Sequence, residues 1–342
     1  MGKKLIWLFM VVLSVLAFVN RSLLKYGWMQ AQGQLKVVWE SKPIEYFMVD
    51  PLFPDSLKVK LEMVQDIRRY CFDSLGLHPS DNYTKVYDQE GQSILWNLSA
   101  CKEFSFVPKR WSFPFLGSFP YKGFFDLDKA KDEKKVLDSL GYDARIRTVG
   151  GWSTLGWFSD PILSNMLNRG EGSLAELLIH ELTHGTLYVK DNISFNENLA
   201  TFIGEKGARL YLKSKYGANS VALLEYEQRE ADYSLLSSHF LKGYQFLNHL
   251  YQDSSFSQLT YDDKYASKMA AIDSVISAMD TLGLHNTSFQ QYFQKTKPNN
   301  AYFMSYKRYY GEQGDFQSEL DSLFGGDLRK YMSYLEKKYP SL

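Results

Sequence analysis

The sequence predicts an α+β protein in which a small mixed sheet region is followed by a mainly helical C-terminal part. Three observations lead to this prediction. Between residues 83 and 149, short segments alternate apolar and polar residues, as half-buried strands do. From residue 172 onward, apolar residues recur at helical spacing over runs too long for strands. The chain has 342 residues, of which 45% are hydrophobic and 16% aromatic, which is enough for a packed core.

This pattern divides the chain into an apolar leader at residues 1–30, a mixed α/β subdomain at 31–171 and a helical part at 172–342. In the mixed part, two helices are expected, and each ends at a glycine that suits a helix terminus, Gly76 and Gly141. These helices span 54–77 and 126–140, and the expected strands are 96–98, 103–107 and 144–149, with a loop rich in proline and glycine at 111–123. The helices expected in the C-terminal part are 172–188, 194–216, 221–252 and 262–282, with shorter ones after Pro298 and Asp315.

One predicted helix carries the pattern His-Glu-x-x-His, formed by His180, Glu181 and His184. Residues four apart lie on the same face of a helix, so both imidazoles can reach a single ion, and Glu181 can point at the water in its open position. The pattern also arises by chance on solvated helices. Here the neighbours are mostly leucine and isoleucine, and burying these polar side chains among them is costly without a partner. A metal ion supplies that partner, so we interpret the pattern as a zinc site.

Glu197 is the candidate for the third metal ligand. It lies at the start of the next apolar helix, and the polar turn at 190–194 lets the chain reverse so that this helix passes beneath the first. Two histidines and one glutamate leave the fourth position of one Zn²⁺ ion for water. An alternative stays open, because Ser194-Phe-Asn-Glu197 also matches a capping box, in which the glutamate bonds back to the start of its own helix.

The reaction class follows from this set of ligands. Zinc lowers the pKa of its bound water toward about 7 and polarises the carbonyl group of a peptide bond. Glu181 is then expected to act as general base toward the water and to pass the proton to the leaving amine. The sequence therefore predicts hydrolysis of amide bonds.

Several segments resemble the bacterial "putative aminopeptidase" family of zinc peptidases, which is related to the gluzincins by its metal-binding motif. The resemblance extends from about residue 45 to the C-terminal region and is carried by the segments 110–125, 151–161, 179–191, 195–202 and 299–310. It implies a zinc-dependent peptidase with His180, His184 and Glu197 as ligands and Glu181 as catalytic base. It also implies a gluzincin-like fold for the helical part.

The chain departs from the family's pattern in ways that affect the expected activity. Ser112 and Ser118 stand where many relatives have cysteines, and no cysteine stands directly after the leader, although many relatives look like lipoproteins. The Gly-x-Met-Glu-Asn motif of the best-known gluzincin aminopeptidases, which hold the α-amine of the substrate, is missing. An aminopeptidase is the first expectation, and the alternatives are a zinc-dependent endopeptidase and a noncatalytic binding or scaffold protein of the cell envelope.

The tetrahedral oxyanion of amide hydrolysis needs a hydrogen-bond donor besides the metal. Related peptidases often use a tyrosine or histidine from a C-terminal helix. The segment 302–310 contains four tyrosines, of which Tyr309 fits the family's pattern best. Aromatic residues at helical spacing also commonly belong to a core, and that alternative stays open.

A peptide substrate is expected to lie beside the metal-binding helix. In many peptidases with this motif, the substrate binds as an added strand on a sheet edge, through backbone hydrogen bonds. The predicted strand at 145–149, or the adjoining loop at 151–158, is the candidate. The alternative is that the loop only packs against its neighbours.

The charge balance and the leader indicate the partners and the compartment. Lys plus Arg equals Asp plus Glu at 39 each, so nothing favours a nucleic acid partner. A start with two lysines precedes an apolar run from Leu5 to Val19, as in an export signal, and no clear cleavage site follows. We interpret the leader as a signal anchor in the bacterial inner membrane with the body in the periplasm; a cleaved signal is the alternative. In that compartment Cys71 and Cys101 either form a disulfide or remain buried thiols.

Overall fold

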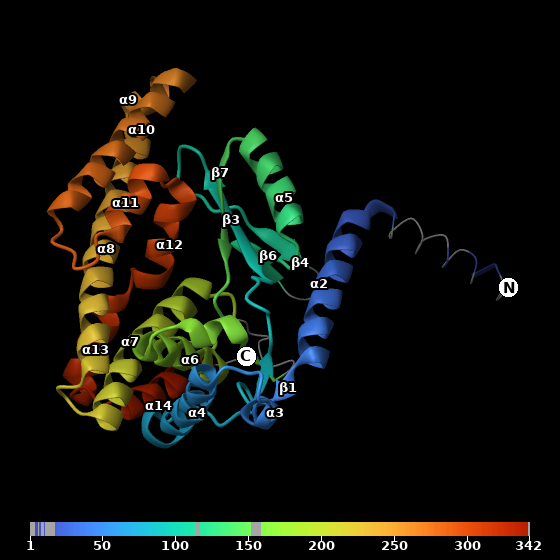
Figure 1. Cartoon of the computed structure of the whole chain (residues 1–342). Coiled ribbons are helices and arrows are strands. Elements are labelled where there is room, and N and C mark those ends of the chain that lie inside the picture. The colour runs from blue at the N-terminus through green and yellow to red at the C-terminus, as the bar shows by residue number, and fades with distance from the viewer. Residues whose placement is uncertain are drawn as a thin grey trace.

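The computed structural model describes residues 18–113, 117–151 and 159–340, together with Lys4, Leu5, Trp7 and Met10 of the leader. Residues 11–17 of the expected signal anchor and nearly all of the 151–158 loop lie outside the described residues. Among the helices that are described, none combines the length and apolarity needed to cross a bilayer. Figure 1 shows a small sheet region between a long N-terminal helix and a group of C-terminal helices, so the α+β prediction is confirmed.

The N-terminal half alternates helices with short strands, and two of its helix ends follow the predicted signals. Gly76 ends the helix predicted at 54–77 with φ of 73°, and Gly141 follows the helix predicted at 126–140 with φ of 72°, so both glycines are left-handed as helix-terminal glycines commonly are. The helices are α2 (Arg21–Glu40), α3 (Ile44–Val49), α4 (Asp55–Tyr70), which continues as a π-helical turn (Cys71–Leu75), and α5 (Leu127–Ser139). The strands are β1 (Lys42–Pro43), β2 (Lys85–Tyr87), β3 (Trp96–Lys102), β4 (Trp111–Phe113), β5 (Gly117–Phe119), β6 (Tyr121–Phe124), β7 (Tyr142–Thr148) and β8 (Ile162–Leu163).

The described strands form three small sheets. β2 pairs with β1 antiparallel and with β8 parallel; β3 lies between β6 and β7, both antiparallel; and β4 pairs with β5. The predicted strand at 103–107 is wrong, because the chain turns there and the Lys102 N–H bonds to the Val107 carbonyl at 3.1 Å. The loop predicted at 111–123 instead contains β4, β5 and most of β6, because residues 111–113 pair with 117–119 and β6 pairs with β3.

The C-terminal half is helical, and its long helices match the predicted ones within a few residues. The predicted helix at 221–252 agrees with the structure at both ends. Three shorter helices were not predicted: α9 (Ser254–Gln258), α11 (Ser288–Lys295) and α14 (Leu328–Lys338). The helices are α6 (Glu171–Thr186) after a 3₁₀ turn (Ser164–Asn168), α7 (Ile193–Tyr216), α8 (Val221–Gln252), α9 (Ser254–Gln258), α10 (Tyr261–Ser277) followed by a 3₁₀ turn (Ala278–Thr281), α11 (Ser288–Lys295), α12 (Asn300–Tyr310), α13 (Gln313–Phe324) and α14 (Leu328–Lys338).

Three apolar clusters hold these elements together. The largest joins α4, α6, α7 and α14, and it contains residues from both sides of the predicted boundary at 171/172, such as Leu61 and Ile179. The second packs α8, α10 and α12 around Phe240. The third packs α5 against Leu98 and Ala144 of the sheet β6-β3-β7. The division of the chain into subdomains at residue 171 stays a prediction.

The sheet β6-β3-β7 lies between two helices, and this arrangement brings side chains of β7 into contact with α12. α5 covers one face and α12 the other (Figure 1). Within the described residues, β7 pairs with β3 alone, so it is an edge strand of this sheet. Arg145 and Arg147 of β7 lie on the α12 side, where their guanidinium groups contact Tyr302 and Tyr309.

Cys71 and Cys101 form no disulfide. Both side chains are buried, and both are free thiols. Burial raises the pKa of each thiol far above its ordinary value, which keeps the sulfur protonated and unreactive. Of the two alternatives open at the sequence level, the structure has the pair of buried thiols.

Candidate metal centre

The site is built on the close contact between α6 and α7, which depends on two glycines of α7. A β-carbon at Gly204 would lie 3.0 Å from the backbone oxygen of Glu176 and 3.3 Å from the β-carbon of His180. A β-carbon at Gly207 would lie 3.0 Å from the Ile179 side chain. Larger residues at these two positions would push the helices apart. The glycines therefore let α7 lie directly against the side of α6 that carries His180.

The start of α7 decides between the two roles considered for Glu197. Asn192 is the N-cap of the helix, and its side chain accepts a hydrogen bond from the Phe195 N–H at 3.3 Å. Ser194 is already inside the helix, so Glu197 lies in the second turn and does not face the cap. The capping-box alternative is therefore wrong, and the carboxylate is available to the histidines.

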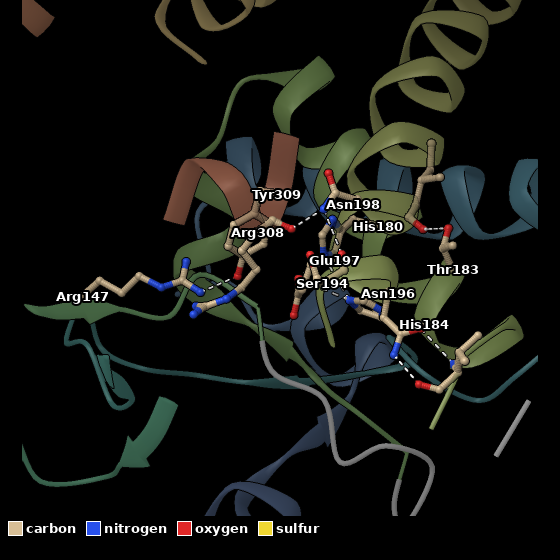
Figure 2. A network of polar contacts seen from close by, with 12 residues as sticks. Arg147, His180, Thr183, His184, Ser194, Asn196, Glu197, Asn198, Arg308 and Tyr309 are labelled. Carbon is tan, nitrogen blue, oxygen red and sulfur yellow. Dashed lines mark hydrogen bonds and ion pairs between the residues drawn. The ribbon is translucent and has the colours of Figure 1, made fainter. Parts of the chain in front are cut away.

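Two buried asparagines hold Glu197 in place from either side. Asn196, 1% exposed, bonds to both the N–H and the carbonyl of Val189 in the link between α6 and α7, at 2.8 and 2.9 Å. Asn198, fully buried, donates to the Arg308 carbonyl at 2.6 Å and accepts from the Glu312 N–H at 2.9 Å, at the end of α12. The link to α6 and the end of α12 are thus both tied to the turn of α7 that carries the glutamate (Figure 2).

The side chains of His180, His184 and Glu197 converge on one point (Figure 2). The two Nε2 atoms are 3.2 Å apart, and they lie 3.5 Å and 3.7 Å from one carboxylate oxygen of Glu197. Tetrahedral zinc binds nitrogen and oxygen at about 2.0–2.2 Å, which places its donor atoms roughly 3.3–3.6 Å from each other. The three donors therefore have the spacing that one zinc ion requires, and they form a group that could hold a metal.

The charges around these side chains favour a cation. Burial tends to raise the pKa of Glu197, but hydrogen bonds from His180 and His184 outweigh it and hold this pKa well below its ordinary value. Burial tends to lower the pKa of His180, but Glu197, Glu181 and Glu176 outweigh it and raise the pKa. Three carboxylates around two imidazoles thus stabilise positive charge at the point where the donors meet. A divalent cation fits that electrostatic environment.

A pocket of about 390 Å³ opens onto the three donors. Glu181 lines it next to His180, and its carboxylate lies against Gly151 at the segment that follows β7. Tyr309 lines it from α12. The pocket therefore contains every side chain for which the sequence predicted a role. Its lining residues are Leu95, Asn97, Tyr121, Arg147, Val149, Gly150, Gly151, Arg169, Ser173, Glu176, Leu177, His180, Glu181, His184, Tyr188, Glu197, Arg229 and Tyr309.

Tyr309 is held by an arginine that the sequence did not identify. A guanidinium nitrogen of Arg147 donates to the Tyr309 hydroxyl oxygen at 2.6 Å (Figure 2). Burial and the charge of Glu197 raise the pKa of Tyr309, and Arg147 offsets only part of this, so the hydroxyl stays protonated at neutral pH. Because Arg147 occupies the oxygen as a donor, the hydroxyl hydrogen is left to donate to a group in the pocket.

A model of the family described as "Putative aminopeptidase" matches residues 25–338. The chain belongs to this family. No curated protein and no solved structure matches the chain. Membership assigns the chain to a family of peptidases, which are hydrolases, and agrees with the resemblance seen in the sequence. The relationship to the gluzincins rests on the metal-binding pattern alone.

Sequence reasoning missed the residues that support this site. For Asn196 and Asn198 a signal existed, because two amides within a run of apolar residues in a buried helix require hydrogen-bond partners. For Arg147 no signal existed, because its partner lies 162 residues away along the chain.

Proposed function

We propose that the protein is a zinc-dependent aminopeptidase that hydrolyses peptide bonds. One observation carries this proposal: three metal-ligand atoms of suitable spacing share a pocket with a glutamate and a tyrosine that are suited to general base and oxyanion donor. Two histidines and one carboxylate are the donor set of several catalytic zinc sites, and they leave a coordination position open. His180, His184 and Glu197 would hold the ion.

When bound, the ion would supply Lewis acidity, which would polarise the scissile carbonyl and make water easier to deprotonate. Glu181 accepts the proton of the attacking water and later delivers it to the leaving amine, so one carboxylate serves both proton transfers. Tyr309 donates its hydroxyl hydrogen to the oxygen of the carbonyl as that oxygen gains negative charge. Arg147 keeps the Tyr309 hydroxyl pointed into the pocket.

We expect the substrate to lie along β7. This strand is an edge strand in the described sheet, and its end leads to Gly150 and Gly151 in the pocket wall. A peptide that adds to this edge by backbone hydrogen bonds would carry its scissile bond past Glu181. Backbone hydrogen bonds are the same for every peptide sequence. Selection among peptides therefore needs further contacts with side chains or chain ends of the substrate.

Substitution of Glu181 tests the proposal. Glu181→Gln keeps the size of the side chain and removes the base, so turnover of a peptide library should fall by at least about 100-fold while zinc content stays at one equivalent. Glu225→Gln, at an exposed position of α8, is the matched control and should leave turnover unchanged. If wild-type and Glu181→Gln proteins both bind zinc and neither cleaves any peptide, a noncatalytic envelope protein replaces the proposed enzyme.

Peptides with free and acetylated amino termini test which bond is cleaved. An aminopeptidase requires the free α-amine, so acetylation should abolish turnover. Cleavage of acetylated peptides at internal bonds would establish the endopeptidase alternative and reject the aminopeptidase.

We also propose that the protein is anchored in the inner membrane of the bacterial envelope with its body in the periplasm. The support is the paired lysines before the apolar run from Leu5 to Val19. Fusion of a reporter that is active only in the periplasm to the C-terminus, combined with membrane fractionation, tests both parts. An inactive reporter or a freely soluble protein would reject the proposal.

A further inference from the structure

Arg169 lies in the metal pocket, just before α6 begins, and has no role in the proposed hydrolysis. Its guanidinium group packs against the first of two consecutive glycines that follow β7, Gly150 and Gly151. A β-carbon at Gly150 would overlap an Nη atom of Arg169, and a β-carbon at Gly151 would overlap a carboxylate oxygen of Glu181. The guanidinium and the catalytic carboxylate therefore lie over neighbouring residues of the same segment.

This arrangement limits the distance between the two groups. Consecutive α-carbons are about 3.8 Å apart, so the Arg169 guanidinium and the Glu181 carboxylate are at most about 11 Å apart. An extended peptide advances roughly 3.3–3.6 Å per residue. A substrate group bound by Arg169 is therefore within about three residues of the bond that Glu181 helps to cleave.

The other two arginines of the pocket already have partners. Arg147 donates to Tyr309. Arg229 donates to the carboxylates of Glu176 and Glu230. The Arg169 side chain, by contrast, has no ion pair or hydrogen bond with any residue of the described part of the chain.

The overall charge of the pocket also favours an anion. Three arginines and three glutamates line it among the described residues, so a bound divalent cation leaves the lining with a net positive charge. Glu176, the one lining glutamate that is neither ligand nor base in the proposed function, is bound by Arg229 and Tyr226.

We propose that Arg169 binds a carboxylate of the peptide, and that the substrates are peptides with a carboxylate within about three residues of the cleaved bond. This inference rests on the proposed peptidase function. A guanidinium matches a carboxylate through two parallel hydrogen bonds. The carboxylate is either the C-terminus of a short peptide or the side chain of an aspartate or glutamate.

Binding measurements separate this inference from the question of turnover. Zinc-loaded full-length Glu181→Gln protein is titrated by calorimetry with two matched pairs of peptides: Leu-Ala-Leu as free acid and as amide, and the amides of Leu-Glu-Leu and Leu-Gln-Leu. At least one carboxylate-bearing peptide should bind about 10-fold to 100-fold more tightly than its neutral partner. The pair that shows the preference identifies the source of the carboxylate.

Arg169→Gln, introduced into the Glu181→Gln protein, should remove the preference for the carboxylate-bearing peptide. Arg169→Lys in the same protein should retain part of that preference. Arg69→Gln, at an exposed position of α4, is the control that should leave it intact. Equal affinities within both pairs, or a preference that survives Arg169→Gln, would overturn the inference. Melting temperature and zinc content verify that the variants are folded. Absence of turnover in protein with Glu181 intact would reject the peptidase, while a preference that depends on Arg169 would still establish the carboxylate site.

Discussion

Arg147 on the edge strand β7 donates a hydrogen bond of 2.6 Å to the hydroxyl of Tyr309 on α12, across 162 residues of sequence. The same α12 is tied to α7 by Asn198, next to Glu197. The strand proposed for substrate, the proposed oxyanion donor and the proposed third metal ligand are therefore connected through the Arg147–Tyr309 hydrogen bond and the two hydrogen bonds of Asn198 (Figure 2). A substitution that moves β7, Tyr309 or Glu197 is therefore expected to displace the other two.

Removal of the Tyr309 hydroxyl should slow hydrolysis. Tyr309→Phe removes one donor to the developing oxyanion, and loss of such a donor typically costs about 100-fold to 1,000-fold in kcat with a smaller change in KM. Steady-state kinetics on the best library peptide measures this. Tyr306→Phe, on the same helix but bonded to Tyr302 outside the pocket, is the control and should keep kcat near the wild-type value.

The contribution of Arg147 should depend on Tyr309. Arg147→Met removes the bond that orients the hydroxyl, so kcat should fall in a background with Tyr309 and fall little further in a Tyr309→Phe background. A double-mutant cycle of the four proteins gives the coupling. Independent, additive effects of the two substitutions would contradict the assignment of Arg147 as the residue that positions Tyr309.

Zinc binding should depend on Glu197 and contribute to stability. Loss of an outer partner of a metal ligand costs about 10-fold to 100-fold in affinity, so Glu197→Gln, which weakens a direct ligand, should cost more than about 100-fold. Metal analysis and zinc titration measure this, with Glu181→Gln as the control that retains zinc. A chelator should lower the melting temperature of the wild type, because an ion that binds only the folded state stabilises it. An unchanged melting temperature would argue against a metal in this group.

Asn198 should contribute strongly to stability. Asn198→Ala removes the acceptor for the Glu312 N–H and the donor to the Arg308 carbonyl in a fully buried position. Buried groups left without partners cost about 1–3 kcal/mol each, so the free energy of unfolding should fall by about 2–4 kcal/mol in urea titrations. Asn219→Ala, at an exposed turn, should change it by less than about 0.5 kcal/mol. A similar small effect at Asn198 would show that the contacts between α7 and α12 are replaceable.

Glu205 should make the protein less stable at alkaline pH. Burial, followed by repulsion from Glu230 and Glu176, raises the pKa of Glu205 from 4.5 to about 8. Between these two pKa values the folded protein holds a proton on Glu205 that the unfolded chain releases. The bound proton therefore contributes to the free energy of unfolding, fully below about pH 4.5, and this contribution is lost as pH rises through about 8.

Glu205→Gln removes this titration, because the amide stays neutral. The variant should be more stable than the wild type at pH 8.5, by on the order of 2 kcal/mol, and close to it at pH 4.5. Urea unfolding at the two pH values measures the difference, with exposed Glu225→Gln as the control. If the free energy of unfolding changed equally between the two pH values in Glu205→Gln and in the wild type, the raised pKa of Glu205 would be contradicted.

Local patterns in the sequence predicted most helices and the residues that form the metal-ligand group. The spacing of His180 and His184 places them on one helix face whatever the rest of the fold does, because helical geometry alone sets it. Glu197 follows the histidines so closely in the sequence that a single reversal of the chain brings its carboxylate to them. The same local rules were wrong at 103–107 and for the capping box, because apolar alternation does not distinguish a strand from a turn, and Asn192 competes with Ser194 for the cap.

The sequence by itself determined the α+β class, the metal-binding pattern and the glutamate beside it, because these depend on residues within about twenty positions of each other. Only the tertiary structure decided that Arg147 holds Tyr309, that Asn198 joins α7 to α12, and that Arg169 lies near Glu181 over two glycines. The partners in the first two contacts are more than 100 residues apart. Such contacts are set by how helices and sheet pack together, and no local spacing encodes that packing.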